Sequence, residues 1–205
     1  MSDPVRSRLY EEGNYGLKVF PLNSDGTYGT GVSIEGTVTV DITFSRTRTN
    51  TPADDIPDYL TRTSPEKGEG TVTIIGLSKA GYQALYNNIV DHNSVLVGGK
   101  RNQSKRLGVT FFNTRNDTVG TSENMFFLPN AVFELPNIST QTIQEDDTTI
   151  RPFELAITCN PQNFTAYGGG TDRYTWAMLN SVDDTSIYST VKTAGTYVPD
   201  SVIGG

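Results

Sequence analysis

The sequence predicts a mainly β fold: an antiparallel β-sandwich or barrel-like domain with one short α-helix and extended arms. Residues 36–44 carry the clearest evidence, because Val38, Val40, Ile42 and Phe44 alternate with polar residues and so give a strand one apolar and one polar face. Such alternation is typical of an antiparallel sheet that packs on a core from one side. The 205 residues suffice for one substantial domain, and a 35% hydrophobic content with 20 glycines suits short strands joined by turns.

The chain divides into an N-terminal arm (1–14), a β domain (15–165) and a C-terminal extension (166–205). The arm has charges but no hydrophobic period, and is expected to be flexible. The β domain opens with a strand at Tyr15 to Phe20, followed by a turn at Asn23-Ser-Asp-Gly26 in which the glycine can take a positive φ.

A long connection follows the alternating strand, which we place at Val32 to Phe44. Residues 45–68 contain three prolines and mixed charges without an apolar period. A connection of this length inside a compact domain is usually functional or disordered. The strand pattern resumes at Glu69 to Ile75.

One helix is predicted after that strand. Ser78 is a good N-cap, and Tyr82, Leu85, Tyr86 and Ile89 fall on one apolar stripe at i, i+3, i+4 and i+7. We expect this helix to lie on a sheet.

Three further strands are expected at Leu107 to Asn113, Asn124 to Leu135 and Ile150 to Asn160, with an acidic turn at Gln144 to Asp147 before the last. In that closing strand an apolar face with Cys159 alternates with a polar face.

The C-terminal extension loses the pattern from Gln162 onward. Gly168-Gly-Gly170 is interpreted as a linker, and Tyr174 to Leu179 as an apolar patch that should dock in a groove on the same or an adjacent copy of the chain. Beyond Val182 little apolar surface remains, so this tail is expected to be mobile or held only at a surface of an assembly.

The charge of the chain argues against general binding to nucleic-acid phosphates, because the formal net charge is -7. No apolar run approaches the about 20 residues of a membrane span, and Met1-Ser-Asp-Pro4 does not open a signal peptide. With one cysteine, no internal disulfide can form. We therefore expect a soluble protein made in a cytoplasm, with no membrane partner.

Catalytic and metal-binding constellations are not predicted. His92 is the only histidine, which excludes multi-His metal sites, and its expected place at the end of the helix suggests a structural residue and not a member of a His-based triad. Cys159 is expected to be a core thiol, residues 145–147 a solvated turn, and the basic cluster at 100–106 a charge contact or an exposed patch. No catalytic residue, metal or cofactor is expected.

Several predicted strands have a polar face that carries threonines and a carboxylate. Asp41, Glu69, Glu134 and Glu154 belong to four different strands. If these strands are neighbours in one sheet, they form an anionic face poor in Lys and Arg, which would suit the lining of a conduit for DNA.

The order of these features resembles the major tail proteins of long-tailed siphophages, in particular the phi13-like family. The resemblance rests on Tyr15-Gly-Leu-Lys18, the Gly36-centred segment with its alternating strand, the long arm, Gly70-Thr-Val-Thr-Ile74 before a short helix, and the closing strand at 148–160 after an acidic turn. It covers roughly residues 15–180.

The resemblance implies a tail tube fold and a structural role in the virion tail, assembled in the cytoplasm of a bacterial host. Hexameric rings of such proteins stack into a tube around the tape measure protein, join tail terminator and distal tail proteins, and later conduct DNA. The residues then expected to face the lumen are Thr37, Thr39, Asp41, Thr43, Glu69, Thr71, Thr73, Glu134, Glu154 and Thr158. The residues expected at inter-subunit contacts of the 45–68 loop are Arg46, Arg48, Asp54, Asp55, Asp58, Arg62 and Lys67.

An alternative from another class is a non-enzymatic β-sandwich that serves as an adhesion or carbohydrate-binding module of a virion. A flat platform formed by Tyr167, Tyr174 and Trp176 would favour it. The same aromatics could instead dock the C-terminal segment onto the core.

Overall fold

The computed structural model describes residues 10–53, 56–87, 89–90, 94–98, 103–116, 120–135, 152–165 and 171–195. Its strands are β1 (Tyr10–Pro21), β2 (Val32–Ser33), β3 (Thr37–Ser45), β4 (Arg48–Ala53), β5 (Ile56–Thr63), β6 (Lys67–Ile74), β7 (Ile89–Val90), β8 (Leu96–Val97), β9 (Leu107–Asn116), β10 (Thr121–Phe133), β11 (Phe153–Cys159), β12 (Gln162–Thr165), β13 (Thr171–Tyr174) and β14 (Ala177–Asn180). Its helices are α1 (Lys79–Leu85) and α2 (Thr185–Ala194). The predicted mainly β, antiparallel fold class is confirmed.

The main sheet runs in the order β2-β1-β9-β10-β11-β6-β3, and β14 also pairs with β10. All of these pairings are antiparallel. The order ends at β2 and β3 without joining them, so the sheet is not a closed barrel.

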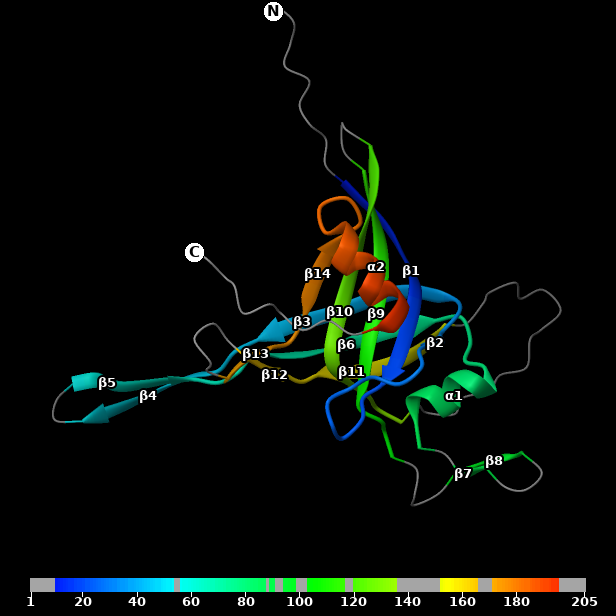
Figure 1. Cartoon of the computed structure of the whole chain (residues 1–205). Coiled ribbons are helices and arrows are strands. Elements are labelled where there is room, and N and C mark those ends of the chain that lie inside the picture. The colour runs from blue at the N-terminus through cyan, green and yellow to red at the C-terminus, as the bar shows by residue number, and fades with distance from the viewer. Residues whose placement is uncertain are drawn as a thin grey trace, which may run out of the picture.

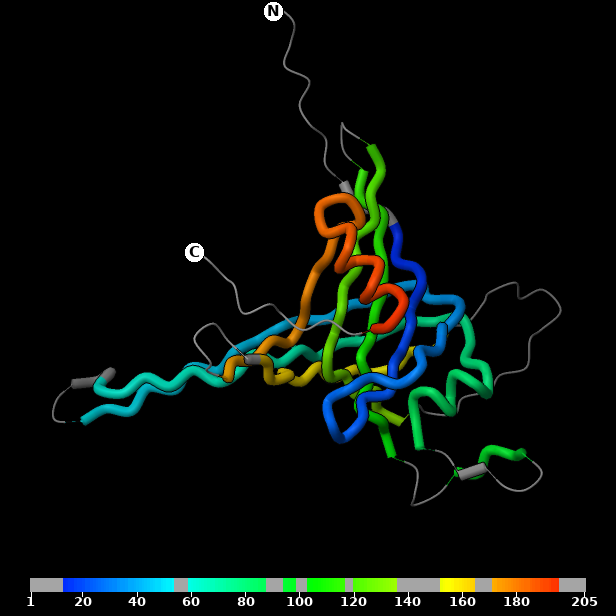
Figure 2. Tube along the Cα trace, in the orientation of Figure 1, coloured from blue at the N-terminus to red at the C-terminus, as the bar shows by residue number. Residues whose placement is uncertain are grey.

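Strand β10 links two layers. Its first part pairs with β9 and β14, and its last residues, Ala131 to Phe133, pair with β11. The register shifts between Leu128 and Ala131, around Pro129, which lacks a donor for the ladder. Figure 1 shows β1, β9, β10 and β14 crossing over β3, β6 and β11. Figure 2 shows the same crossing in the trace of the chain.

The main core lies between these layers. Leu17, Val19 and Val109 from one layer cluster with Val72 and Leu155 from the other. Cys159 belongs to this cluster, is 1% exposed and is a free thiol, as predicted. Burial raises its pKa to about 12.

Helix α1 begins where the sequence predicts. The Ser78 side chain accepts a 3.1 Å hydrogen bond from the backbone N–H of Gly81, and the helix packs against β1 and β2. It ends one turn earlier than the apolar stripe suggested, because Tyr86 is already extended and Ile89 lies in β7.

Helix α2 is the main difference from the sequence-based expectation, in which residues beyond Val182 form a tail that is mobile or held only at a surface of an assembly. Tyr188 and Val191 are buried and complete a second apolar cluster with Phe112, Met125 and Phe127 on the outer face of the β9–β10 layer. The prediction was wrong because two apolar residues, spaced at i and i+3, are enough to cover an apolar sheet face already provided by other strands.

The 45–68 segment is also more regular than expected. Strands β4 and β5 form an antiparallel hairpin that continues the β3–β6 pair and extends away from both layers (Figure 1). At the N-terminus, β1 already begins at Tyr10, inside the segment taken as an arm. The acidic turn at 144–147, Gly168 to Gly170, His92, and Lys100 and Arg101 of the basic cluster lie outside the described residues.

Candidate functional site: an acidic sheet face and a projecting hairpin

Strands β10, β11, β6 and β3 are neighbours in that order, so their polar residues share one face of the sheet. Across this face Glu154 is opposite Thr73, and Thr73 is opposite Thr39. The next two rows along the strands are Ala156, Thr71 and Asp41, and Thr158, Glu69 and Thr43. The four strands are neighbours, so the common polar face expected from the sequence is present.

Glu134 joins this face just beyond the end of β10. Its backbone N–H donates to the carbonyl oxygen of Ala156 at 2.9 Å, which continues the ladder by one residue. Phe133 before it is buried and Glu134 itself is exposed, as strand alternation requires.

The face is anionic. Asp41, Glu69, Glu134 and Glu154 are all exposed. Among the described strand residues on this side the one cation is Lys67, at the border of the face opposite Ser45. Four carboxylates therefore outnumber one ammonium group, and a phosphate would be repelled.

Thr37 does not belong to this face. The register shifts between Thr37 and Thr39, so that Thr37 stands opposite the buried Ile74, and its hydroxyl oxygen is buried without a hydrogen-bond partner. Val38 is exposed next to the exposed Thr39. The uninterrupted alternation predicted from the sequence is wrong at this point, because a β-bulge inserts one extra residue and reverses the faces before it.

The inner side of β3 borders an apolar groove at the open mouth of the sandwich. Its volume is about 240 Å³, and its walls are Val40, Ile42, Phe44, Phe111, Phe126, Leu128 and Trp176. Strand β3 is also the last strand in the sheet order. Its backbone edge and the neighbouring groove are both features that associating proteins commonly cover.

The β4–β5 hairpin presents polar and apolar side chains to the surroundings. Tyr59 is 65% exposed and Leu60 is 43% exposed, and Arg48 and Arg62 are exposed as well. A hollow on one side of the hairpin is lined by Leu60 and Arg62 together with threonines 47, 49 and 51. An isolated two-stranded hairpin is marginally stable in water, so this arm offers a surface suited to a contact.

The residues predicted at inter-subunit contacts do not all lie on the outer part of the hairpin. Arg46 pairs with Glu66 of its own chain at 3.3 Å, between Nε and Oε2, and Lys67 belongs to the border of the acidic face. Asp54 and Asp55 lie outside the described residues, and Asp58 is described only through its place in β5.

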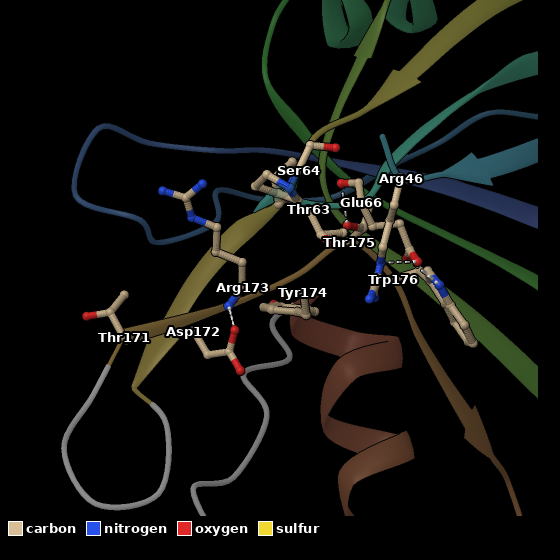
Figure 3. A pocket seen from close by; sticks show the side chains of 12 residues that line it. Arg46, Thr63, Ser64, Glu66, Thr171, Asp172, Arg173, Tyr174, Thr175 and Trp176 are labelled. Carbon is tan, nitrogen blue, oxygen red and sulfur yellow. Dashed lines mark hydrogen bonds and ion pairs between the residues drawn. The ribbon is translucent and has the colours of Figure 1, made fainter. Parts of the chain in front are cut away.

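A pocket of about 660 Å³ lies where the hairpin joins the body (Figure 3). Arg46, Ser64 and Glu66 from the root of the hairpin line one side, and Tyr174 and Trp176 line another. Sequence reasoning missed Glu66 as a member of this site, because nothing in its sequence neighbourhood signals the distant segment that contacts it.

The aromatic residues considered for a sugar platform have other partners. The Tyr174 ring meets Phe164 edge-on at 5.8 Å, and the Trp176 ring lies 6.0 Å from that of Phe44. Tyr167 is not among the described residues. These contacts favour the second interpretation of the sequence, in which the aromatics dock the C-terminal segment.

Among the described residues no group of three or more His, Cys, Asp and Glu is arranged to hold a metal ion. The search for long apolar helices within the same residues finds none that could cross a membrane. Neither the protein-family models nor the curated proteins contain a match to this chain.

Proposed function

We propose that this chain is a structural subunit that assembles with copies of itself into rings, and that the rings stack into a hollow tube for the passage of DNA. More specifically, the chain would be a major tail tube subunit of a siphophage virion, similar to the proteins of the phi13-like family. No catalysis and no cofactor is part of this function. Its partners would be other copies, the tape measure, tail terminator and distal tail proteins, and transiently DNA.

The observation that carries the proposal is the acidic face of four neighbouring strands. In a ring each carboxylate of one subunit repeats once per copy, so Asp41, Glu69, Glu134 and Glu154 would each form a ring of negative charge. A wall of this kind repels phosphate and offers DNA no cation to bind, which suits rapid passage.

Two further features support self-assembly. The β3 edge and the groove beside it would be covered by an adjacent subunit. The hairpin, with Tyr59 and Leu60 exposed, would reach another copy and bury apolar area there. Closed rings formed by such head-to-tail contacts leave no copy unpaired.

Negative-stain electron microscopy of the purified protein over a range of concentrations tests the proposal. We expect rings with a central hole, stacked into tubes at high concentration. A protein that stays monomeric at every concentration, with sedimentation velocity as the second measurement, would contradict self-assembly.

A further inference from the structure

The hairpin has a weak point at its root. Strands β3 and β4 are separated by Arg46 and Thr47, and β5 and β6 by Ser64, Pro65 and Glu66. Pairing persists only locally there: the Ser64 N–H donates to the Thr47 carbonyl at 2.8 Å, and the Thr47 N–H donates to the Ser64 hydroxyl at 2.8 Å. Pro65 has no N–H to add to the ladder, so a two-stranded ribbon of this kind can bend at its root.

Glu66 receives contacts at this root from separate parts of the chain (Figure 3). Arg46 Nε lies 3.3 Å from its Oε2, and Trp176 Nε1 donates to its Oε1 at 3.1 Å. The Thr175 hydroxyl donates to its backbone carbonyl at 3.0 Å. The side chain therefore joins β3's end and the C-terminal segment.

The C-terminal segment is itself fixed to the body. Thr175 is buried, and the Trp176 ring packs against Phe44. The next residue, Ala177, begins β14 and is paired with Phe127 of β10. Through Trp176, Glu66 is therefore joined to a segment that is paired with the main sheet.

We propose that Glu66 is a positioning residue that sets the direction of the β4–β5 hairpin, and that Thr175 and Trp176 hold it in place. The inference extends the proposed function, in which the hairpin must reach a second copy. A hairpin fixed in direction loses less conformational freedom when it binds, so assembly is favoured by preorganisation.

If Glu66 positions the hairpin, removal of its side chain should change the direction of the hairpin much more than the free energy of unfolding. Arg46 is largely exposed, and exposed ion pairs contribute little to the free energy of unfolding. Removal of the Glu66 side chain should therefore leave the folded body nearly as stable as before while the hairpin samples more directions. Removal of a residue that only stabilised the fold would instead lower the free energy of unfolding and leave the range of hairpin directions unchanged.

The test measures the hairpin's direction in the full-length protein. Thr49→Cys in β4 and Ser186→Cys in α2 place cysteines at two exposed positions for spin labels. Double electron–electron resonance between the two labels then measures the distance from the hairpin to the body. The buried Cys159 should remain unlabelled. We expect a narrow distance distribution in the parent, at least a twofold wider one in Glu66→Ala, and a parent-like one in the control Glu35→Ala, which alters an exposed carboxylate before β3.

Trp176→Phe is the second variant, because it removes the indole N–H donor and keeps a smaller aromatic ring next to Phe44. It should also widen the distribution, and it keeps the test valid if Glu66→Ala fails to fold. Parent-like widths in the folded variants would overturn the positioning role.

Assembly of the same variants is measured separately by sedimentation velocity. Glu66→Ala should assemble more slowly than both the parent and Glu35→Ala, and equal rates together with a widened distribution would overturn the link to assembly. A parent that never assembles would contradict the proposed function, whereas the distance measurement would still decide the role of Glu66.

Discussion

The Tyr188 hydroxyl donates a 2.6 Å hydrogen bond to Oε2 of Glu123, and this contact ties α2 to β10. Lys192 Nζ lies 2.8 Å from the same oxygen, and the Tyr15 hydroxyl donates to Oε1 at 2.6 Å. Hydrogen bonds from Lys192, Tyr15 and Tyr188, in that order, lower the pKa of the Glu123 carboxyl to about 2. For Tyr15, burial and then the contacts with Glu123 raise the pKa to about 12.

This cluster predicts a pH-dependent contribution to stability. A carboxyl whose pKa is lower in the folded state stabilises the fold above its ordinary value of 4.5, and that contribution is lost as the pH falls from about 4.5 to 2. Glu123→Gln should lower the free energy of unfolding by about 1–2 kcal/mol at pH 7, a modest value because water screens the half-exposed cluster. Denaturant unfolding at pH 7 and near pH 2.5 measures it.

Glu35→Gln serves as the control, since this carboxylate is exposed. The difference between Glu123→Gln and the parent should shrink toward pH 2.5. A difference that stays constant with pH would show that the ionised carboxylate does not stabilise the attachment of α2.

Gly70 is predicted to be essential for the pairing of β3 with β6. A Cβ atom at this position would overlap the backbone carbonyl of Asp41 on the neighbouring strand. Gly70→Ala should therefore force the strands apart and cost about 3 kcal/mol of unfolding free energy. Gly76→Ala is the matched control, because a Cβ there meets no atom within 4 Å; equal stability of the two variants would contradict the close approach.

The sequence predicted the features that depend on neighbouring residues in the chain, and it did not predict those that depend on contacts with distant segments. Alternation located β6 and β11 and placed Cys159 in the core, because period-two patterning is a local property. The bulge at Thr37 and the bend of β10 around Pro129 depend on the partner strands, and the sequence of one strand does not contain them.

The candidate site divides in the same way. Asp41, Glu69 and Glu154 were assigned to polar faces correctly, and their common face required only that the strands be neighbours. Glu66 and Glu123 were missed, because Trp176 lies 110 residues from Glu66, Tyr188 lies 65 residues from Glu123, and one carboxylate looks like another in the sequence. Helix α2 was missed because its apolar stripe is short, and the face that it covers belongs to distant strands.

Cys159 is predicted to be unreactive in the folded protein. Its thiol is buried, and burial raises its pKa to about 12, so almost no thiolate exists at pH 8. A water-soluble disulfide reagent should label less than about a tenth of the thiol in native protein and all of it in denaturant. Fast stoichiometric labelling without denaturant would contradict the burial of Cys159 between the layers.

The acidic face predicts how assembled particles interact with DNA. Asp41→Lys with Glu154→Lys should preserve assembly and create binding to DNA that weakens as salt rises, because each added cation replaces counterions on phosphate. The control variant, Glu35→Lys with Asp183→Lys, makes the same change in net charge at exposed positions outside the four strands of this face. Retention of short duplex DNA by sedimented particles at 50 and 300 mM salt is the measurement. Equal retention by both variants would show that net charge, and not the face, governs contact with DNA.

The hairpin is predicted to serve assembly and to be dispensable for folding. Residues 49–62 can be replaced by a short glycine-containing turn. The Thr47–Ser64 backbone hydrogen bond and the Arg46–Glu66 ion pair lie outside the replaced segment and still join the two strands at the base of the hairpin. Among the side chains whose burial the structure describes, the buried core residues all lie outside this segment, so the free energy of unfolding should change by less than about 1 kcal/mol. The shortened protein should remain monomeric at concentrations where the parent forms rings, as seen by sedimentation velocity and electron microscopy.

Leu60→Ser with Tyr59→Ser is the milder variant, because it removes the two exposed apolar side chains but keeps the hairpin. It should also weaken assembly, but by less than the replacement of the whole segment. Normal tubes from the shortened protein would refute the contact role of the hairpin while leaving the acidic face to be tested on its own.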